Sequence, residues 1–278
     1  MAEQHSQVFF PSAFHELFTT WEAYPEAILF AGGTDIIWEQ GKESLYLPPT
    51  IICMDRLEEL HRITRTERYL EIGSMVKLNQ IIRLGKIVPE VLSNCLINIT
   101  GPQLRNIATI GGNICCNSRR LDLSAPMAAL DAQFELRSSQ ASRWISATRF
   151  FSINETVLAP HELLARIRVP LDQWDYTVYR KFRGQTKRIN KVAVFIIKNQ
   201  KNVLSDIRVV YKTDIIIRNK NCESALIGKN LPLSRRAADD FVKNWKAYLD
   251  DYKEINDLSK QEFVNFIEFH INNLSEYS

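Results

Sequence analysis

The sequence predicts a mixed fold of helices and strands, and two patterns along the chain support it. Over roughly the first 170 residues, short apolar runs typical of strands are interspersed with segments of helical spacing. Beyond a turn at Pro170–Trp174 come three runs rich in β-branched and aromatic residues, followed by three helical segments. Two glycine pairs lie far apart in the first region, each beside a threonine. A chain of 278 residues is long enough for one large domain or two smaller ones.

The first region reads, in chain order, as short strands separated by helices. Ser12 is expected to cap a helix whose apolar residues recur at helical spacing and which ends at Pro25. Thr34 or Asp35 is expected to cap a second helix, directly after the first glycine pair. The expected strands are 27–31, 50–54, 69–73, 133–137, 144–146 and 162–169; the other expected helical segments are 57–60, 77–84, 89–98 and 127–130, with a turn at 149–152.

The C-terminal region is expected to hold three strands, at 176–182, 192–198 and 207–211. The middle run is apolar throughout, as a buried strand should be. Three helices are expected to follow, at 219–227, 234–249 and 259–274. The last has the pattern of a capping box, with Ser259 and Glu262 three positions apart.

The two glycine pairs are the strongest candidates for a ligand site. Glycine has no Cβ, so a ligand can approach its backbone closely and the chain can adopt φ > 0. Successive exposed N–H groups in such a turn bind anions, usually phosphate, and a strand followed by a glycine turn and a helix start suits a pyrophosphate. Neither pair belongs to a Walker A motif or a G-x-G-x-x-G fingerprint, so either one alone could be a structural turn. Together they predict the two sides of one anion-binding cleft.

Composition narrows the function classes. The net charge of +3 is too small to indicate a nucleic-acid partner, and no apolar run approaches the ~20 residues of a membrane span. The N-terminal segment lacks the pattern of a signal peptide, so a cytoplasmic protein is expected. The five cysteines include no C-x-x-C, so no zinc site or iron–sulfur cluster is expected on this chain. Cys115 and Cys116 are expected to be core thiols, with a redox role beside a cofactor as the alternative.

Several motifs in order give a more specific indication: AGGTD at 31–35, GPQLRN at 101–106, TIGGNI at 109–114, Asp122 followed by PMAALD at 126–131, LAPHELLARIRVP at 158–170 and YRKF at 179–182. On these residues, essentially the whole chain resembles the FAD-binding (medium) subunit of the molybdenum hydroxylases, of the xanthine dehydrogenase and carbon monoxide dehydrogenase type. The resemblance implies a vanillyl-alcohol-oxidase (PCMH)-type FAD-binding domain over 1–172, whose two α+β subdomains, about 1–55 and 56–172, sandwich FAD. It also implies a C-terminal domain over 173–278, built from a three-stranded antiparallel sheet and a helical bundle.

The same resemblance implies a set of cofactor-binding residues. The first loop would wrap the pyrophosphate, and it comprises Leu29, Phe30, Ala31, Gly32, Gly33, Thr34, Asp35 and Ile36. The second loop would lie near the pyrophosphate and the flavin, and it comprises Thr109, Ile110, Gly111, Gly112 and Asn113. Asp122 would bind ribose or adenine-side polar groups, or else cap the following helix. Leu164 and Lys181 would line the isoalloxazine ring, with Lys181 near its polar edge, although Lys181 alone reads equally well as a solvated strand residue.

The implied function is electron transfer by a non-covalently bound FAD. Electrons would come from a large molybdopterin-binding subunit through two [2Fe-2S] clusters on a small subunit, and leave to NAD, another carrier or oxygen. A dimer of heterotrimers is one arrangement of such a complex, and purines are the substrate expected by family frequency. This chain would carry no catalytic residue and no metal ligand. A free-standing FAD-dependent oxidoreductase of the same fold and a flavin-free structural subunit are the alternatives.

The chain departs from the family pattern at three places. Gly101 stands where the family often has serine, and Arg119 and Arg120 stand where it usually has small residues. The loop after Lys181 is basic, whereas the well-known xanthine dehydrogenases carry acidic residues near the nicotinamide site; its cations are Arg183, Lys187, Arg188 and Lys191. A solvated surface is the default interpretation of such a run. A surface that binds an anion or a partner is the alternative for this run. A separate hypothesis is that Arg119 and Arg120 change the choice of electron acceptor.

Overall fold

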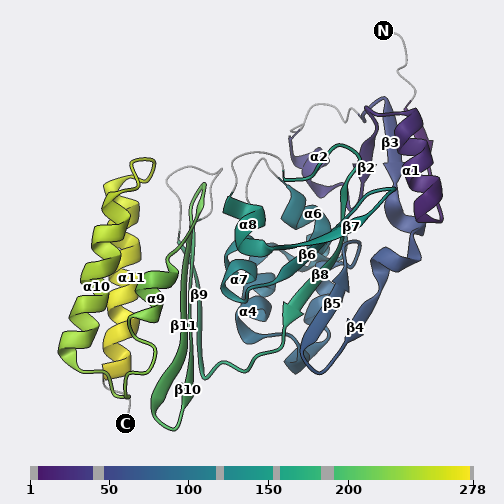
Figure 1. Ribbon diagram of the computed structural model, residues 1–278. Helices are drawn as coiled ribbons and strands as arrows, with labels where there is room; N and C mark the ends of the chain where they lie inside the picture. Colours follow the sequence, from purple (N-terminus) through teal and green to yellow (C-terminus); the bar gives the residue numbers. More distant parts are fainter. Residues whose placement is uncertain (1–5, 40–46, 117–121, 153–156, 183–190, 276–278) are drawn as a thin grey trace.

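The computed structural model describes residues 6–39, 47–116, 122–152, 157–182 and 191–275. These residues form three β-sheets with helices between and outside them (Figure 1). Figure 1 shows the C-terminal helices as an outer layer at the left. The C-terminal sheet, a layer of helices and the central sheet follow toward the right, where the N-terminal segment lies. The mixed fold of helices and strands expected from the sequence is confirmed.

The N-terminal sheet is small and parallel. It contains β1 (Gln7–Phe9), β2 (Ile28–Phe30) and β3 (Thr50–Cys53) in the order β1-β3-β2. The helix α1 (Phe14–Ala23) connects β1 to β2 and buries Phe14, Leu17 and Phe18. After β2 the chain turns through the first glycine pair into α2 (Thr34–Glu39). This parallel β2–turn–α2 connection places the glycines at the carboxyl end of a strand, where ligands bind in open sheets.

The central sheet is antiparallel and has five strands, in the order β4-β5-β8-β6-β7. Its strands are β4 (Ile63–Arg65), β5 (Tyr69–Gly73), β6 (Gln133–Arg137), β7 (Ser142–Ser146) and β8 (Leu163–Pro170). Short helices cover the inner face and share its core; they are α3 (Leu78–Ile82), α4 (Glu90–Ile99), α6 (Ile110–Cys115), α7 (Ser124–Ala129) and α8 (Ala147–Ser152). The one-turn helix α5 (Pro102–Arg105) buries none of its residues.

The C-terminal sheet is antiparallel in the order β12-β11-β10-β9 and is covered on both faces. Along β10 (Lys191–Gln200), Val194 belongs to the core shared with α4 and α7, whereas Phe195 belongs to the core shared with α10 and α11. Burial of both faces explains why this run is apolar without alternation. The other elements are β9 (Tyr176–Phe182), β11 (Val203–Lys212), β12 (Ile216–Arg218), α9 (Lys220–Ser224), α10 (Arg235–Asp250) and α11 (Asp257–Ser275).

Four expectations about elements are wrong. The C-terminal sheet has four strands rather than three, because β12 is only three residues long and shows no alternating pattern. The expected turn at 149–152 lies in α8. Ser12 does not cap α1, because the N-cap residue is Ala13. The main-chain N–H of Ser12 instead donates to the Glu16 carboxylate at 2.7 Å. The capping box at Ser259 is absent, because α11 begins earlier and Asn256 Oδ1 accepts from the Ser259 N–H at 2.8 Å.

Within the described ranges, no helix is both long enough and apolar enough to cross a lipid bilayer.

Candidate functional site

The two glycine segments meet in the folded chain. A Cβ placed on Gly32 would lie 2.3 Å from the carbonyl oxygen of Ile107, just before the second glycine segment. A Cβ on Gly112 would lie 4.0 Å from the Cβ of Ala31. Residues about 75 positions apart along the chain are therefore in van der Waals contact, and a side chain at Gly32 would collide with main-chain atoms.

The first glycine segment is a turn with available donors. Gly33 has φ +67°, a left-handed conformation that favours glycine, and a Cβ there would lie 2.4 Å from the Phe30 ring. The Gly33 carbonyl accepts from the Ile37 N–H at 3.1 Å, which begins the first turn of α2. The N–H groups of Gly32, Gly33 and Thr34 donate to no main-chain carbonyl of a described residue. This turn therefore presents successive main-chain donors at the end of β2.

The second glycine segment uses its donors internally. The N–H of Ile110 donates to Val76, that of Gly111 to Ser74 and that of Asn113 to Thr109, at 2.9–3.0 Å. The Gly112 N–H donates to the Thr109 hydroxyl at 3.0 Å, which makes Thr109 the N-cap of α6. A Cβ on Gly111 would lie 2.5 Å from that of Ser74. The expectation that both pairs supply N–H donors is therefore wrong for the second pair, whose glycines permit close approach instead.

A cavity of ≈ 740 Å³ adjoins both segments. Among the predicted cofactor-binding residues, it is lined by Leu29, Ala31, Gly111, Gly112 and Leu164. Cys115, for which a redox role beside a cofactor was the alternative interpretation, also lines the cavity. The sequence assigned no cofactor role to the other lining residues, which are Trp21, Pro25, Ala27, Met54, Ser74, Met75, Leu158, Ala159, Pro160, His161, Glu162 and Leu163. Most of these side chains are apolar, as in a site for a planar organic ring.

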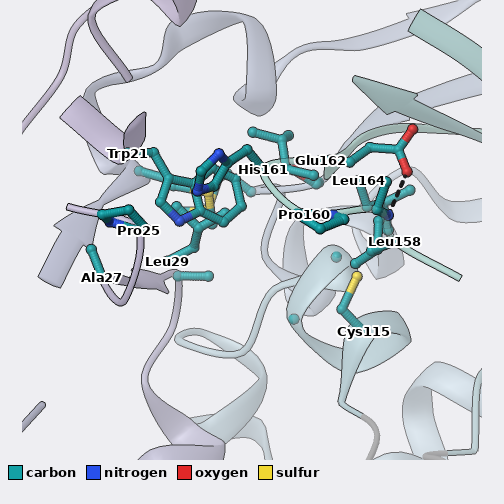
Figure 2. A pocket seen from close by; sticks show the side chains of 18 residues that line it. Trp21, Pro25, Ala27, Leu29, Cys115, Leu158, Pro160, His161, Glu162 and Leu164 are labelled. Carbon is teal, nitrogen blue, oxygen red and sulfur yellow. Dashed lines mark hydrogen bonds between the residues drawn. The ribbon is translucent and has the colours of Figure 1, made fainter. Parts of the chain in front are cut away.

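Figure 2 shows the cavity from close by, with Trp21 and His161 lying together near Pro25. The ring centroids of Trp21 and His161 are 5.3 Å apart and the rings are tilted by 52°. His161 has φ 56°, which a non-glycine residue adopts at a cost in free energy. Trp21 fits the apolar spacing of α1 and reads as a core residue, so only the LAPHELL segment gave a sequence signal for this end of the cavity.

An ion pair holds the cavity-lining loop before β8. Arg143, on β7, donates from Nε and an Nη atom to the two carboxylate oxygens of Glu162, both at 2.7 Å. The Ala159 N–H also donates to Glu162, at 3.0 Å, and Arg143 donates to the Val157 carbonyl at 3.0 Å. The hydrogen bonds from Arg143 lower the pKa of Glu162 below its ordinary value. The loop carrying His161 is thus fixed by charge-assisted bonds on both sides.

Asp122 and Lys181 are brought together, but away from the cavity lining. The Lys181 ammonium donates to Asp122 Oδ2 at 2.6 Å, and Asp122 is almost fully buried. Burial, together with the neighbouring Cys95 and Asp122, raises the pKa of the Tyr179 phenol, which stays protonated. Asp122 does not cap α7, whose N-cap residue is Leu123. Arg119, Arg120, Arg183, Lys187 and Arg188 lie outside the described residues.

The remaining predicted residues surround the contact between the segments. Phe30, Thr34, Asp35 and Ile36 are half-buried at the first turn, whereas Thr109, Ile110 and Asn113 are buried at the second. Two buried oxygens, Ser74 Oγ in the cavity lining and Asn113 Oδ1 in the second segment, have no hydrogen-bond partner among the residues that the structure describes. Asp122 Oδ1, outside the cavity lining, also has none. Buried polar atoms normally have partners, so these atoms fit a bound group with polar atoms of its own.

Two further features bear on the chemistry. Burial, with a smaller contribution from Cys116, raises the pKa of the Cys115 thiol to about 12, so this cavity-lining thiol is protonated at neutral pH. In the described part of the chain, no group of three or more His, Cys, Asp or Glu side chains is arranged to hold a metal ion. The site therefore offers donors, an apolar cavity and unpaired acceptors, which suit an organic cofactor with an anionic part.

Comparisons with known proteins agree with this geometry. Residues 4–172 match the family described as FAD binding domain in molybdopterin dehydrogenase. Xanthine dehydrogenase 2 of Arabidopsis thaliana is 29% identical over 230 residues, which are 74% of this chain and 17% of that protein. The xanthine dehydrogenase FAD-binding subunit of Escherichia coli O157:H7 is 32% identical over 150 residues, which are 52% of this chain and 51% of that subunit. The matches thus span about half, or less, of the length of these curated relatives.

Solved structures show the same fold over the full chain. Quinoline 2-oxidoreductase from Pseudomonas putida 86 gives a TM-score of 0.79 at 19% identity, covering 98% of this chain and 97% of that one. Reconstituted CO dehydrogenase from Oligotropha carboxidovorans gives 0.79 at 18% identity, covering 99% and 98%. At these identities the likeness establishes the fold, and the fold class expected from the resemblance is confirmed.

Proposed function

The chain belongs to the family of FAD-binding domains in molybdopterin dehydrogenases, and on that premise we propose that it is the FAD-carrying electron-transfer subunit of a xanthine dehydrogenase-like molybdenum hydroxylase. In this role it receives electrons from [2Fe-2S] clusters on a small partner subunit, which are reduced by a molybdopterin site on a large one. The electrons then leave to NAD or another acceptor. The observation that carries the proposal is the contact between the two glycine segments beside an apolar cavity.

The first glycine segment holds the diphosphate in this proposal. The N–H groups of Gly32, Gly33 and Thr34 point their partial positive charge toward the anion, and the absence of a Cβ at the glycines allows it to approach. Gly112 leaves room where the cofactor passes α6, since it lines the cavity and carries no side chain. In this arrangement the first segment supplies the hydrogen-bond donors, and the second leaves space for the cofactor.

The cavity takes the flavin ring. Leu29 and Leu164 supply an apolar wall, and the Arg143–Glu162 pair keeps the facing loop in place. Bound FAD supplies the redox chemistry, because it accepts and releases electrons singly or in pairs, whereas the protein orients the ring and excludes water. The cofactor is held without a covalent bond in this proposal, and the protonated Cys115 thiol is no nucleophile at neutral pH.

Asp122 and Lys181 belong to the polar side of the proposed site. Asp122 Oδ1 lacks a partner among described atoms, so it is available to a donor on the cofactor. The Lys181 ammonium is partly exposed and bound to the other carboxylate oxygen, so in this proposal the pair contributes polar contacts to the cofactor outside the cavity rather than an unpaired positive charge at the ring. The partner subunits, a heterotrimeric assembly, a purine substrate and a cytoplasmic location complete the proposal.

Titration of the purified chain with FAD tests the cofactor assignment. We expect flavin absorption bands that remain after gel filtration and are lost on denaturation. A Gly33→Asp variant, which places a carboxylate among the donors, is expected to bind no FAD while remaining folded by circular dichroism. Absence of FAD binding by the folded wild-type chain would contradict the proposal and favour a flavin-free structural subunit.

Co-purification from the source cells with a small iron–sulfur subunit and a large molybdopterin subunit tests the electron-transfer role. We expect a stable complex in which reduction of the clusters is followed by bleaching of the visible absorption band of the bound flavin. A chain that binds FAD but associates with neither subunit would instead be a free-standing oxidoreductase.

A further inference from the structure

Ser74 lines the cavity and follows directly after β5. Its main chain is fixed on both sides, because its N–H donates to Ala165 at 3.0 Å and its carbonyl accepts from Gly111 at 2.9 Å. Its side chain lines the cavity and is 4% exposed. The Cα–Cβ bond that carries the hydroxyl is therefore held in place by the main chain of β8 and α6.

The Ser74 hydroxyl has no hydrogen-bond partner within the described ranges. A hydroxyl that loses its water on folding and gains no partner opposes folding. An alanine would fill the same position without that cost, and Gly111 packs on the Cβ and main chain of Ser74, which alanine retains. The serine thus contributes nothing visible to packing that alanine would not also contribute.

Two of the other polar side chains that line the cavity are engaged elsewhere or are poor donors. Glu162 is bound by Arg143 and by the Ala159 N–H. Cys115 carries a thiol, which is a weak donor. Trp21 and His161 lie against each other (Figure 2). Among the residues that line the cavity, Ser74 carries the hydroxyl, and it packs against Gly111 of the second glycine segment.

We propose that Ser74 is a cofactor-binding residue whose hydroxyl donates a hydrogen bond to an acceptor atom of the flavin ring. The inference rests on the proposed function and adds a contact that the glycine segments do not supply. In the chain without cofactor the hydroxyl is an unpaired buried group; in the complex it acquires a partner. Compared with alanine, serine at this position therefore lowers the stability of the FAD-free protein and raises its affinity for FAD.

This difference predicts opposite effects of one substitution on two measurements. Ser74→Ala is expected to leave the melting temperature of the FAD-free chain unchanged or raised. It is expected to weaken FAD binding about fivefold, the loss typical of one neutral hydrogen bond. The dissociation constant is measured by fluorescence titration, and the visible band of the bound flavin is expected to shift, since the hydrogen bond acts on the ring.

Tyr211→Phe is the matched control, because Tyr211 is a fully buried residue of the C-terminal core whose hydroxyl also lacks a partner among described atoms. Its FAD affinity is expected to equal that of the wild type. If Ser74→Ala lowers the stability of the empty chain, Ser74→Cys replaces it as the test, because the thiol keeps the size of the side chain and is a weak donor.

The two proposals fail in different ways. A wild-type chain that binds no FAD contradicts the proposed function. A wild-type chain that binds FAD, together with Ser74 variants whose dissociation constants and flavin spectra equal those of the wild type, contradicts the role of Ser74 and leaves the proposed function standing.

Discussion

Gly32–Gly33 and Gly111–Gly112 are the same dipeptide in two different backbone settings. The first pair forms a turn, with Gly33 at φ +67° and N–H groups that donate to no described main-chain carbonyl. The second pair lies within α6, and its N–H groups donate to Ser74 and Thr109. One pair provides hydrogen-bond donors, and the other allows a helix to lie close to its neighbours.

The comparison also separates the two glycines within each pair. Gly32 and Gly111 both face main-chain atoms, of Ile107 and Ser74 respectively, at distances no Cβ could occupy. Gly33 and Gly112 face only side-chain atoms at close range. A glycine pair can thus combine one position required for packing with another that is available to a ligand.

Gly111→Ala is expected to have the largest effect, on folding rather than on binding. Its Cβ would lie 2.5 Å from Ser74 Cβ and 2.8 Å from Ser74 O, so β5 and α6 must separate. We expect a loss of about 3 kcal/mol in the free energy of unfolding, measured by urea denaturation. Gly101→Ala is the control, since its Cβ would approach only the flexible Gln103 side chain, at 3.3 Å. Equal losses in the two variants would show that close packing is not what the second pair provides.

Arg143→Met tests the wall that faces the glycine segments. It leaves the buried Glu162 carboxylate without its main partner, and we expect a loss of about 2 kcal/mol at pH 7. Arg236→Met is the control, because Arg236 is 94% exposed and lies 4.0 Å from Asp240. That exposed pair is expected to contribute less than about 0.5 kcal/mol.

The same pair gives a pH dependence of definite sign. The pKa of Glu162 is lower in the folded chain than its ordinary value of 4.5, so the folded state favours the charged carboxylate. The stabilisation is present above pH 4.5 and is lost as pH falls through the lowered pKa. The difference between wild type and Arg143→Met should therefore shrink when urea denaturation is repeated at decreasing pH below 4.5. A constant difference across that range would mean that packing, and not charge, holds the loop.

Gly33→Ala and Gly85→Ala form the pair that separates backbone strain from ligand contact. Both glycines have positive φ, +67° and +61°, so each alanine is expected to cost about 1 kcal/mol of stability. Only Gly33→Ala should also weaken FAD binding, by about tenfold. The added methyl group displaces the Phe30 ring, and the turn that carries the N–H donors shifts with it. Similar dissociation constants for FAD in the two variants would show that the first turn does not bind the diphosphate.

Gly112→Ala is expected to have the smallest effect on stability, below about 0.5 kcal/mol. Its nearest obstacle is the Thr109 hydroxyl at 2.8 Å, and turning that hydroxyl away gives up the N-cap bond to residue 112. This loss is about as large as the gain from alanine as the better helix former, so the two offset each other. The added methyl group enters the cavity, so FAD affinity should fall by several-fold in fluorescence titration, on the order of one steric contact. Unchanged affinity would place the cofactor away from α6.

Long or strongly patterned elements could be predicted from the sequence, whereas very short ones could not. The bounds of β5, β6 and β9 agree with those expected, because each has a clear apolar pattern and flanking turns. The strands β1, β4 and β12 are three residues long and give no periodic signal. The helix α6 was missed because two of its six residues are glycine, which reads as a loop although Thr109 caps it.

The site was predictable to the extent that its contacts are made by the main chain. Glycine pairs mark backbone turns and close approaches in the sequence itself, which is why both segments were found. The Trp21–His161 contact and the Ser74 hydroxyl depend on side chains from distant elements, and no local pattern distinguishes a cavity-facing tryptophan from a core one. The division into domains at 1–172 and 173–278, with subdomains about 1–55 and 56–172, stays a prediction, as do the roles of Asp122 and Lys181.

Site-resolved amide hydrogen exchange, with and without FAD, tests the central difference between the two glycine segments most directly. The account predicts that FAD slows exchange at Gly32, Gly33 and Thr34 by at least about tenfold, because these donors gain an acceptor. It predicts that the amides from Ile110 to Asn113 are already protected without FAD and change little. Protection on FAD binding at Ile110–Asn113, with none at Gly32–Thr34, would contradict it.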